Sequence, residues 1–121
     1  MTTQRPDLRL RTKQFALRII RLWRTLPSSE EARILGKQLL RSGTSVGANY
    51  RAACRARSKA EFIAKIGIVL EEADEAVFWL ELLIEVGIGS HDKVQELVKE
   101  ADELTSIFVA SLCTAKNIAP S

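Results

Sequence analysis

Apolar residues recur at spacings of three and four along most of the chain, as they do on one face of an α-helix. Four such stripes follow one another, separated by short segments that contain proline, glycine or serine. The pattern predicts four amphipathic helices at residues 12–26, 28–55, 58–86 and 90–116. Short connections favour antiparallel neighbours, so the expected fold is all-α, an antiparallel up-and-down four-helix bundle.

Residues at the ends of these stripes are typical helix boundaries. Thr12 is the predicted N-cap of the first helix, and Pro27 ends that helix because the residue before a proline avoids helical angles. Ser28 or Ser29 caps the second helix. Ser58 and Glu61 form a capping box at the start of the third, which Gly87 ends, and Ser90 caps the fourth.

These boundaries divide the chain into three parts. Residues 1–11 mix polar and basic side chains around Pro6 and predict a flexible N-terminal arm. Residues 12–116 form the four-helix bundle, and residues 117–121 are a C-terminal tail.

Three glycines lie inside the second predicted helix, at Gly36, Gly43 and Gly47. Each costs about 1 kcal/mol relative to alanine in a helix interior, so each needs a reason to be there. One interpretation is that a neighbouring backbone approaches closely along this line. The other is a break or kink in the helix near Gly43.

Composition places the chain among ordinary globular proteins: 46% of its 121 residues are hydrophobic and 27% are charged. No apolar run approaches the roughly 20 residues of a membrane span, and the start lacks the apolar stretch of a signal peptide, so a cytoplasmic location is expected. Cys54 and Cys113 are expected to be reduced, half-buried thiols. With His91 as the single histidine, neither a metal site nor a cofactor is expected.

Charge is distributed very unevenly along the chain. Residues 1–57 contain thirteen Lys and Arg against three Asp and Glu, whereas residues 58–121 contain five against twelve. All eleven arginines lie in the first part. Either the two parts neutralise each other, or the basic part has an anionic partner.

Basic residues of the second predicted helix form a row along one face. The spacing of i, i+4 and i+8 places three of them in line, two more continue the row, and two from the first helix extend the field. Phosphate binding requires several positive groups held at backbone spacing. The candidate nucleic-acid-binding residues are therefore Arg18, Arg21, Arg33, Lys37, Arg41, Arg51 and Arg55. The alternative is that these cations pair with carboxylates of the second half, within or between subunits.

The sequence also contains a cluster of four carboxylates, Glu71, Glu72, Asp74 and Glu75. Di-iron bundles combine such carboxylates with Glu-x-x-His motifs, and the sequence contains none. Nothing in it assembles a nucleophile, a base and a pocket, so an enzyme is not expected. A charged face that mates with the arginines explains the cluster more simply.

Aromatic and polar residues inside the helices suggest packing roles. Trp23 falls on the apolar stripe of its helix and is expected in the core rather than as a platform for nucleic-acid bases. Phe78 and Trp79 are adjacent and cannot both face one core, so they are candidate oligomer-interface residues. Asn49 is expected to bond a backbone carbonyl of an adjacent helix, and Thr44 and Ser45 are expected to bond back to their own helix.

Several stretches resemble one bacterial family. They are Gln38–Ser42, Ser45–Ala52, Arg57–Phe62, Leu70–Glu75 and Trp79–Leu83. The family is the four-helix-bundle proteins encoded within intervening sequences of bacterial 23S ribosomal RNA genes. It includes relatives of the accessory variability determinant of diversity-generating retroelements. The resemblance spans about residues 8 to 115.

The resemblance implies a homopentamer of four-helix bundles. For the retroelement relatives it also implies a basic surface that binds nucleic acid and a reverse transcriptase. In one place the chain departs from the pattern: Ala52 and Ala53 stand where many members have glutamate and glycine. The expected function is thus a non-enzymatic, oligomeric accessory protein that binds the RNA or DNA backbone. The alternative is a scaffold that docks a protein such as a reverse transcriptase and does not itself contact nucleic acid.

Overall fold

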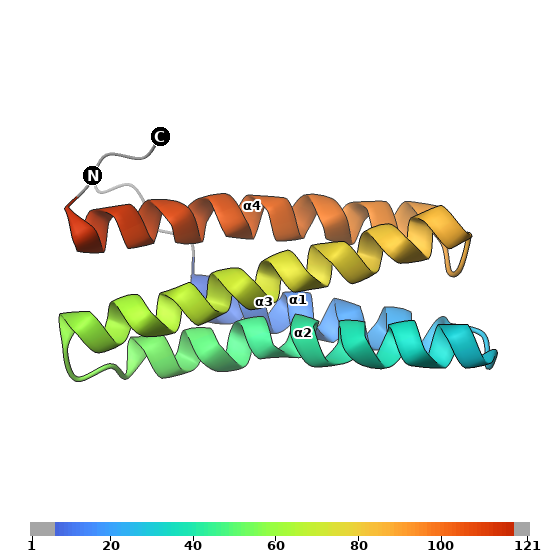
Figure 1. Ribbon diagram of the computed structural model, residues 1–121, viewed down its shortest axis with the longest axis horizontal. Coiled ribbons are helices and arrows are strands. Elements are labelled where there is room, and N and C mark those ends of the chain that lie inside the picture. The colour runs from blue at the N-terminus through green and yellow to red at the C-terminus, as the bar shows by residue number, and fades with distance from the viewer. Residues whose placement is uncertain (1–6, 118–121) are drawn as a thin grey trace.

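The computed structural model describes residues 7–117, and these form four helices that lie side by side (Figure 1). Helix α1 spans Leu8–Thr25, α2 spans Glu30–Cys54, α3 spans Lys59–Val86 and α4 spans His91–Lys116. The 28 residues of α3 extend about 42 Å at 1.5 Å per residue. The prediction of an all-α chain with four helices is confirmed.

The helices are arranged as a four-sided bundle in chain order. Backbone contacts join α1 to α2, α2 to α3, α3 to α4 and α4 back to α1, whereas within residues 7–117 the backbones of diagonally opposite helices do not approach each other. In Figure 1, α2 and α4 lie at opposite edges, with α3 crossing in front of α1. The α1–α4 side is the most sparsely packed of the four.

The core fills the space between the four apolar stripes. Its largest side chains are less than 2% exposed, and every helix contributes at least one of them: Phe15, Ile19, Leu39, Ile66, Leu80, Leu83, Leu104 and Phe108. This agrees with the spacing of three and four residues, which places one stripe of each helix on the inside.

Three of the predicted caps are confirmed. Ser29, Ser58 and Ser90 are N-caps. The hydroxyl oxygen of each accepts a hydrogen bond from the backbone N–H of the residue three positions later. Gly87 ends α3 with φ of 74°, a left-handed conformation that glycine adopts without a Cβ clash.

The prediction for the start of α1 was wrong. The helix begins at Leu8, where the Asp7 carboxylate accepts from the Leu10 N–H at 3.1 Å. Thr12 is buried inside the helix, and its hydroxyl donates back to the Leu8 carbonyl at 2.6 Å. Residues 8–11 of the predicted arm are therefore helical, while residues 1–6 and 118–121 lie outside the described residues.

The glycines of α2 mark close approach to α1, and α2 runs without a break. A Cβ added at Gly43 would lie 2.9 Å from Ile19 Cγ1, and one at Gly47 would lie 3.3 Å from the Thr12 carbonyl oxygen. The packing interpretation is thus correct, and the predicted alternative of a kink is not.

Two apolar assignments at the bundle surface were wrong. Trp23 is 38% exposed, because it lies where α1 meets α2 rather than at the centre of the stripe. Cys54 is exposed at the last residue of α2, while Cys113 is half-buried as expected. Among residues 7–117, no helix is sufficiently long and apolar to cross a membrane.

Candidate nucleic-acid interface

The four helices carry very different charges. Helix α1 has six Lys and Arg and no carboxylate, and α2 has four against two. In contrast, α3 has seven carboxylates against two lysines, and α4 has five against three. Because α1 lies beside α2 and α3 beside α4, the fold turns an asymmetry along the chain into a cationic side and an acidic side of one bundle.

The seven predicted nucleic-acid-binding residues do not form one surface. Helix geometry explains why: each step of four residues turns about 40° around the axis, so a row of i+4 steps drifts sideways. A step of 18 residues is five full turns and returns to the same face. The structure divides the seven into an outer face of α2, the α2–α3 boundary and the α1–α4 groove.

The first group is the α2 cationic face, defined by Arg33, Lys37, Arg51 and Arg55. Arg51 is 18 residues after Arg33, so these two lie on one face about 27 Å apart. Arg55 is 18 residues after Lys37 and is the C-cap residue directly after α2. All four are exposed. Within residues 7–117, none of them has a carboxylate oxygen within 4.0 Å.

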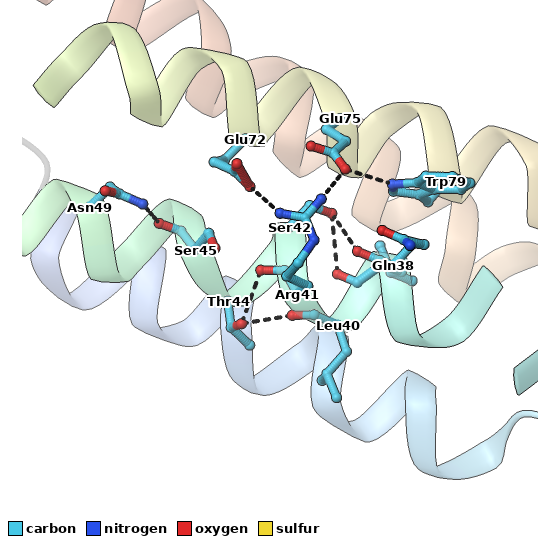
Figure 2. Close-up of polar contacts among 11 residues, drawn as sticks. Gln38, Leu40, Arg41, Ser42, Thr44, Ser45, Asn49, Glu72, Glu75 and Trp79 are labelled. Carbon is cyan, nitrogen blue, oxygen red and sulfur yellow. Dashed lines mark hydrogen bonds and ion pairs between the residues drawn. The ribbon is translucent and has the colours of Figure 1, made fainter. Parts of the chain in front are cut away.

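Arg41 belongs to the second group, because it points across the boundary between α2 and α3 (Figure 2). Its guanidinium bonds Glu72 at 3.2 Å and also pairs with Glu75. Glu75 in turn accepts from the Trp79 indole N–H at 3.2 Å. For Arg41 the structure therefore shows the predicted alternative, pairing with carboxylates of the second half of the chain.

Arg18 and Arg21 form the third group, in a groove between α1 and α4. This half-open cavity of about 280 Å³ also has Lys93 and Glu96 at its rim and Leu22 in its wall. The two arginines lie on the side of α1 that faces α4, away from the glycine contacts with α2. They do not extend the α2 cationic face, contrary to the expectation.

Arg11 forms an ion pair that was not predicted from the sequence. Its guanidinium makes two 2.7 Å bonds to Glu100 and a 3.3 Å contact to Glu103. The hydrogen bonds that Arg11 donates to Glu100 are the main cause that raises the pKa of Arg11 above its usual value. The pair was not predicted because Arg11 was placed in a flexible arm. Leu8 continues the apolar stripe of the first helix, and this was the signal that the helix begins before Arg11.

Phe78 and Trp79 occupy different environments. Phe78 is 52% exposed, whereas Trp79 is half-buried with its N–H held by Glu75. Their rings meet edge to face with centroids 5.0 Å apart. The carboxylates around them hold no metal cluster: the region 7–117 has no group of three His, Cys, Asp or Glu side chains placed to bind an ion.

The polar residues within α2 bond to their own helix. Asn49 donates to the Ser45 carbonyl at 2.9 Å, so the expected bond to an adjacent helix was wrong (Figure 2). Thr44 donates to the Leu40 carbonyl at 2.7 Å, as predicted. Each bond links residues four apart, which satisfies the polar group without a partner from another helix.

Tyr50 is a half-buried group on the core side of α2, with its ring 5.5 Å from that of Phe108. Burial, assisted by the neighbouring Cys54 side chain, raises the pKa of Tyr50 to about 12. The ring therefore stays neutral at any physiological pH and contributes to packing.

The architecture defines a class: a small all-α protein of four antiparallel helices, with cationic and acidic helices in adjacent pairs. The model of the family described as 23S rRNA-intervening sequence protein matches residues 7–110. The chain belongs to this family, as the resemblance predicted.

A solved structure has the same fold. It is a protein of unknown function from the S23 ribosomal protein family of Bacteroides thetaiotaomicron VPI-5482. The two chains are 36% identical and superpose with a TM-score of 0.80, over 87% of this chain and 97% of the other. Among curated proteins, no sequence matches.

Proposed function

We propose that this protein is a non-enzymatic, oligomeric accessory protein that binds the backbone of nucleic acid through the α2 cationic face. The observation that supports the proposal is the lack of neutralisation there. Arg33, Lys37, Arg51 and Arg55 are exposed, and among residues 7–117 no carboxylate lies within 4.0 Å of any of them. The acidic residues of the chain lie mainly on α3 and α4 instead.

The spacing within the face suits a polyanion. Residues four apart on a helix are about 6 Å apart along the axis, close to the distance between neighbouring phosphates of one strand. Arginine forks bind phosphate oxygens in pairs, which favours this residue type for backbone contact. Adjacent α1 has no carboxylate that would repel the strand.

The test is the salt dependence of binding to a labelled oligonucleotide, followed by fluorescence anisotropy. Four phosphate contacts to a single strand give a slope of about −2.8 in log K against log salt, roughly a 50-fold loss of affinity between 50 and 200 mM. Replacing Arg33 and Lys37 with glutamine should lower the slope by about 1.4 for every sequence tested.

A matched control is the pair Lys65→Gln and Lys99→Gln on the acidic side, which removes the same charge from α3 and α4. This control should keep most of the parent affinity. Equal losses in the two double variants would mean that only net charge matters. In that case the α2 cationic face is not the site.

For assembly, we propose a homopentamer, on the strength of the family resemblance. Phe78 supports an interface on α3, because a phenylalanine ring that is 52% exposed is costly to leave in water. Light scattering should give about five times the monomer mass, and Phe78→Ser should lower it. A stable monomer at micromolar concentration contradicts this assembly.

The scaffold alternative has its own supporting observation, the groove between α1 and α4. Its lining combines three cations, Arg18, Arg21 and Lys93, with one carboxylate, Glu96, and apolar leucines, a net positive surface that suits an acidic segment of a protein such as a reverse transcriptase. Binding of purified reverse transcriptase that survives nuclease and is lost in Arg18→Gln/Arg21→Gln would favour it. Loss on nuclease treatment would favour nucleic acid.

A further inference from the structure

We propose that Trp23 is a base-stacking platform, so that the ligand of the α2 cationic face is single-stranded nucleic acid. The inference rests on the proposed function and specifies its ligand. It concerns the surface where α1 meets α2, which carries the exposed indole of Trp23.

The Trp23 side chain is held in place rather than loose. A Cβ added at Gly36 would lie 3.1 Å from Trp23 Cδ1 and 3.5 Å from Nε1, so the five-membered edge of the indole sits against the bare backbone of α2. Leu26 packs against the same glycine, with Cδ1 at 3.0 Å from that position. The indole is thus fixed at one edge while 38% of the residue is in contact with water.

Exposed cations lie near the place where Trp23 packs on α2. On α2, Arg33 is three residues before Gly36 and so lies beside the glycine against which Trp23 packs, and Lys37 lies one turn after Arg33 on the same outer face. Arg24 follows Trp23 in the chain and is exposed as well. A nucleotide whose base stacks on Trp23 would therefore have its own and its neighbouring phosphate within reach of unpaired cations.

This combination selects a single strand. In a duplex the faces of the bases are covered by their neighbours, and only the backbone is presented to a flat surface. A single strand can turn one base out onto an aromatic ring while its phosphates follow a basic surface. Backbone cations alone accept both forms, so Trp23 is the residue that discriminates between them.

Phe78 is the other exposed aromatic residue among residues 7–117, and its neighbours carry the opposite charge. Phe78 is more exposed than Trp23. However, it lies on α3, with Asp74, Glu75 and Glu81 at helical spacings of three and four around it. These carboxylates repel a phosphate backbone. Among the aromatic residues between 7 and 117, only Trp23 combines exposure with cationic neighbours.

Tryptophan fluorescence provides a direct test. The chain has two tryptophans, so Trp79→Phe leaves Trp23 as the only emitter. Titrating this variant with single-stranded oligo(dT) and oligo(rU) should quench Trp23 fluorescence. Comparing the two oligonucleotides shows whether DNA or RNA is preferred. A duplex of the same length should bind with little quenching. This readout leaves Trp23 itself unchanged and so does not depend on how a substitution there folds.

In the same background, Trp23→Leu should weaken single-strand binding roughly 5- to 150-fold, the range measured for loss of one stacked base. Duplex binding should change little, and Trp23→Phe is the matched control that keeps an aromatic ring and should retain more single-strand affinity than Trp23→Leu. Circular dichroism should show unchanged helix content in both variants.

The outcomes separate the two proposals. If Arg33→Gln/Lys37→Gln weakens binding but Trp23→Leu does not, or if duplex quenches as strongly as single strand, the stacking inference is wrong while backbone binding stands. If neither set of variants alters affinity, or no oligonucleotide binds, both proposals are wrong. Quenching by single strands together with a selective loss in Trp23→Leu supports both.

Discussion

Arg11 donates two hydrogen bonds of 2.7 Å to Glu100, one from Nε and one from Nη2, and so joins the first turn of α1 to the middle of α4. The two side chains are 27% and 16% exposed. Because α1 and α4 have the sparsest contact of any neighbouring pair, this two-pronged pair is a principal link across that side of the bundle.

Breaking this link should destabilise the protein. We expect Glu100→Gln to lower the free energy of unfolding by about 1–2 kcal/mol, the range for charge-assisted hydrogen bonds that are partly shielded from water. Urea unfolding measures it. Glu103→Gln is the control: that carboxylate is 57% exposed and makes one 3.3 Å contact, so it should cost less than about 0.5 kcal/mol. Equal effects would contradict this account.

Two glycines should respond to alanine in opposite directions. At Gly43 the new Cβ meets Ile19 Cγ1 at 2.9 Å. Because Ile19 is fully buried and stiff at χ1, overpacking of about 1–3 kcal/mol should exceed the gain of about 1 kcal/mol in helix propensity. Gly43→Ala should therefore lower the melting temperature.

Gly67 on α3 is the counterpart, because a Cβ there would meet nothing within 4 Å. We expect Gly67→Ala to stabilise the protein by about 0.5–1 kcal/mol through helix propensity alone. Thermal unfolding of the two variants side by side tests both statements. A stabilising effect at Gly43 would mean that α1 and α2 are not packed as closely as described.

Arg41 should matter less for binding than Arg33. Its charge is already matched by Glu72 and Glu75, so Arg41→Gln should change oligonucleotide affinity less than twofold. Arg33→Gln should weaken binding several-fold in the same assay. Since the Arg41 side chain is 50% exposed, the loss of its ion pairs should cost only about 0–1 kcal/mol of stability. A larger effect on binding at Arg41 would show that its carboxylate partners release it.

Tyr50 should titrate near pH 12 instead of 10. The chain has one tyrosine, so absorbance at about 295 nm reads this group alone. Because the pKa of the folded state is raised, the unfolded state loses its proton first. The contribution of Tyr50 to the free energy of unfolding is then fully present below about pH 10 and is lost as the pH rises toward 12. Burial is the main cause, so Cys54→Ser should lower the pKa only slightly; a return to 10 would contradict that.

Much of the fold followed from local rules. Helix starts at Ser29, Ser58 and Ser90 were predictable because an N-cap depends only on the next three residues. Thr12 misled because a threonine hydroxyl can also bond backward to the turn before it, as it does to Leu8. Asp7 was the better signal, since Leu8 continues the apolar stripe that runs through Phe15.

The candidate site was less predictable. The sequence identified all four members of the α2 cationic face, but it also included Arg41, Arg18 and Arg21. A helical row drifts around its axis, and what lies beside each residue depends on which helix packs there. Trp23 was predicted in the core because it belongs to the apolar stripe of its helix. It lies at the edge of that stripe, and only the packing of α2 against α1 shows that part of the residue stays exposed.

The sequence by itself determined four amphipathic helices, their order and the concentration of arginine in the first half. These properties depend on residues within a few turns of each other, where spacing and capping decide the outcome. Only the tertiary structure decided which charges are neutralised, because pairing joins residues such as Arg11 and Glu100 that are 89 positions apart. Packing in chain order places two cationic helices side by side, which leaves the α2 cationic face without carboxylate partners between residues 7 and 117.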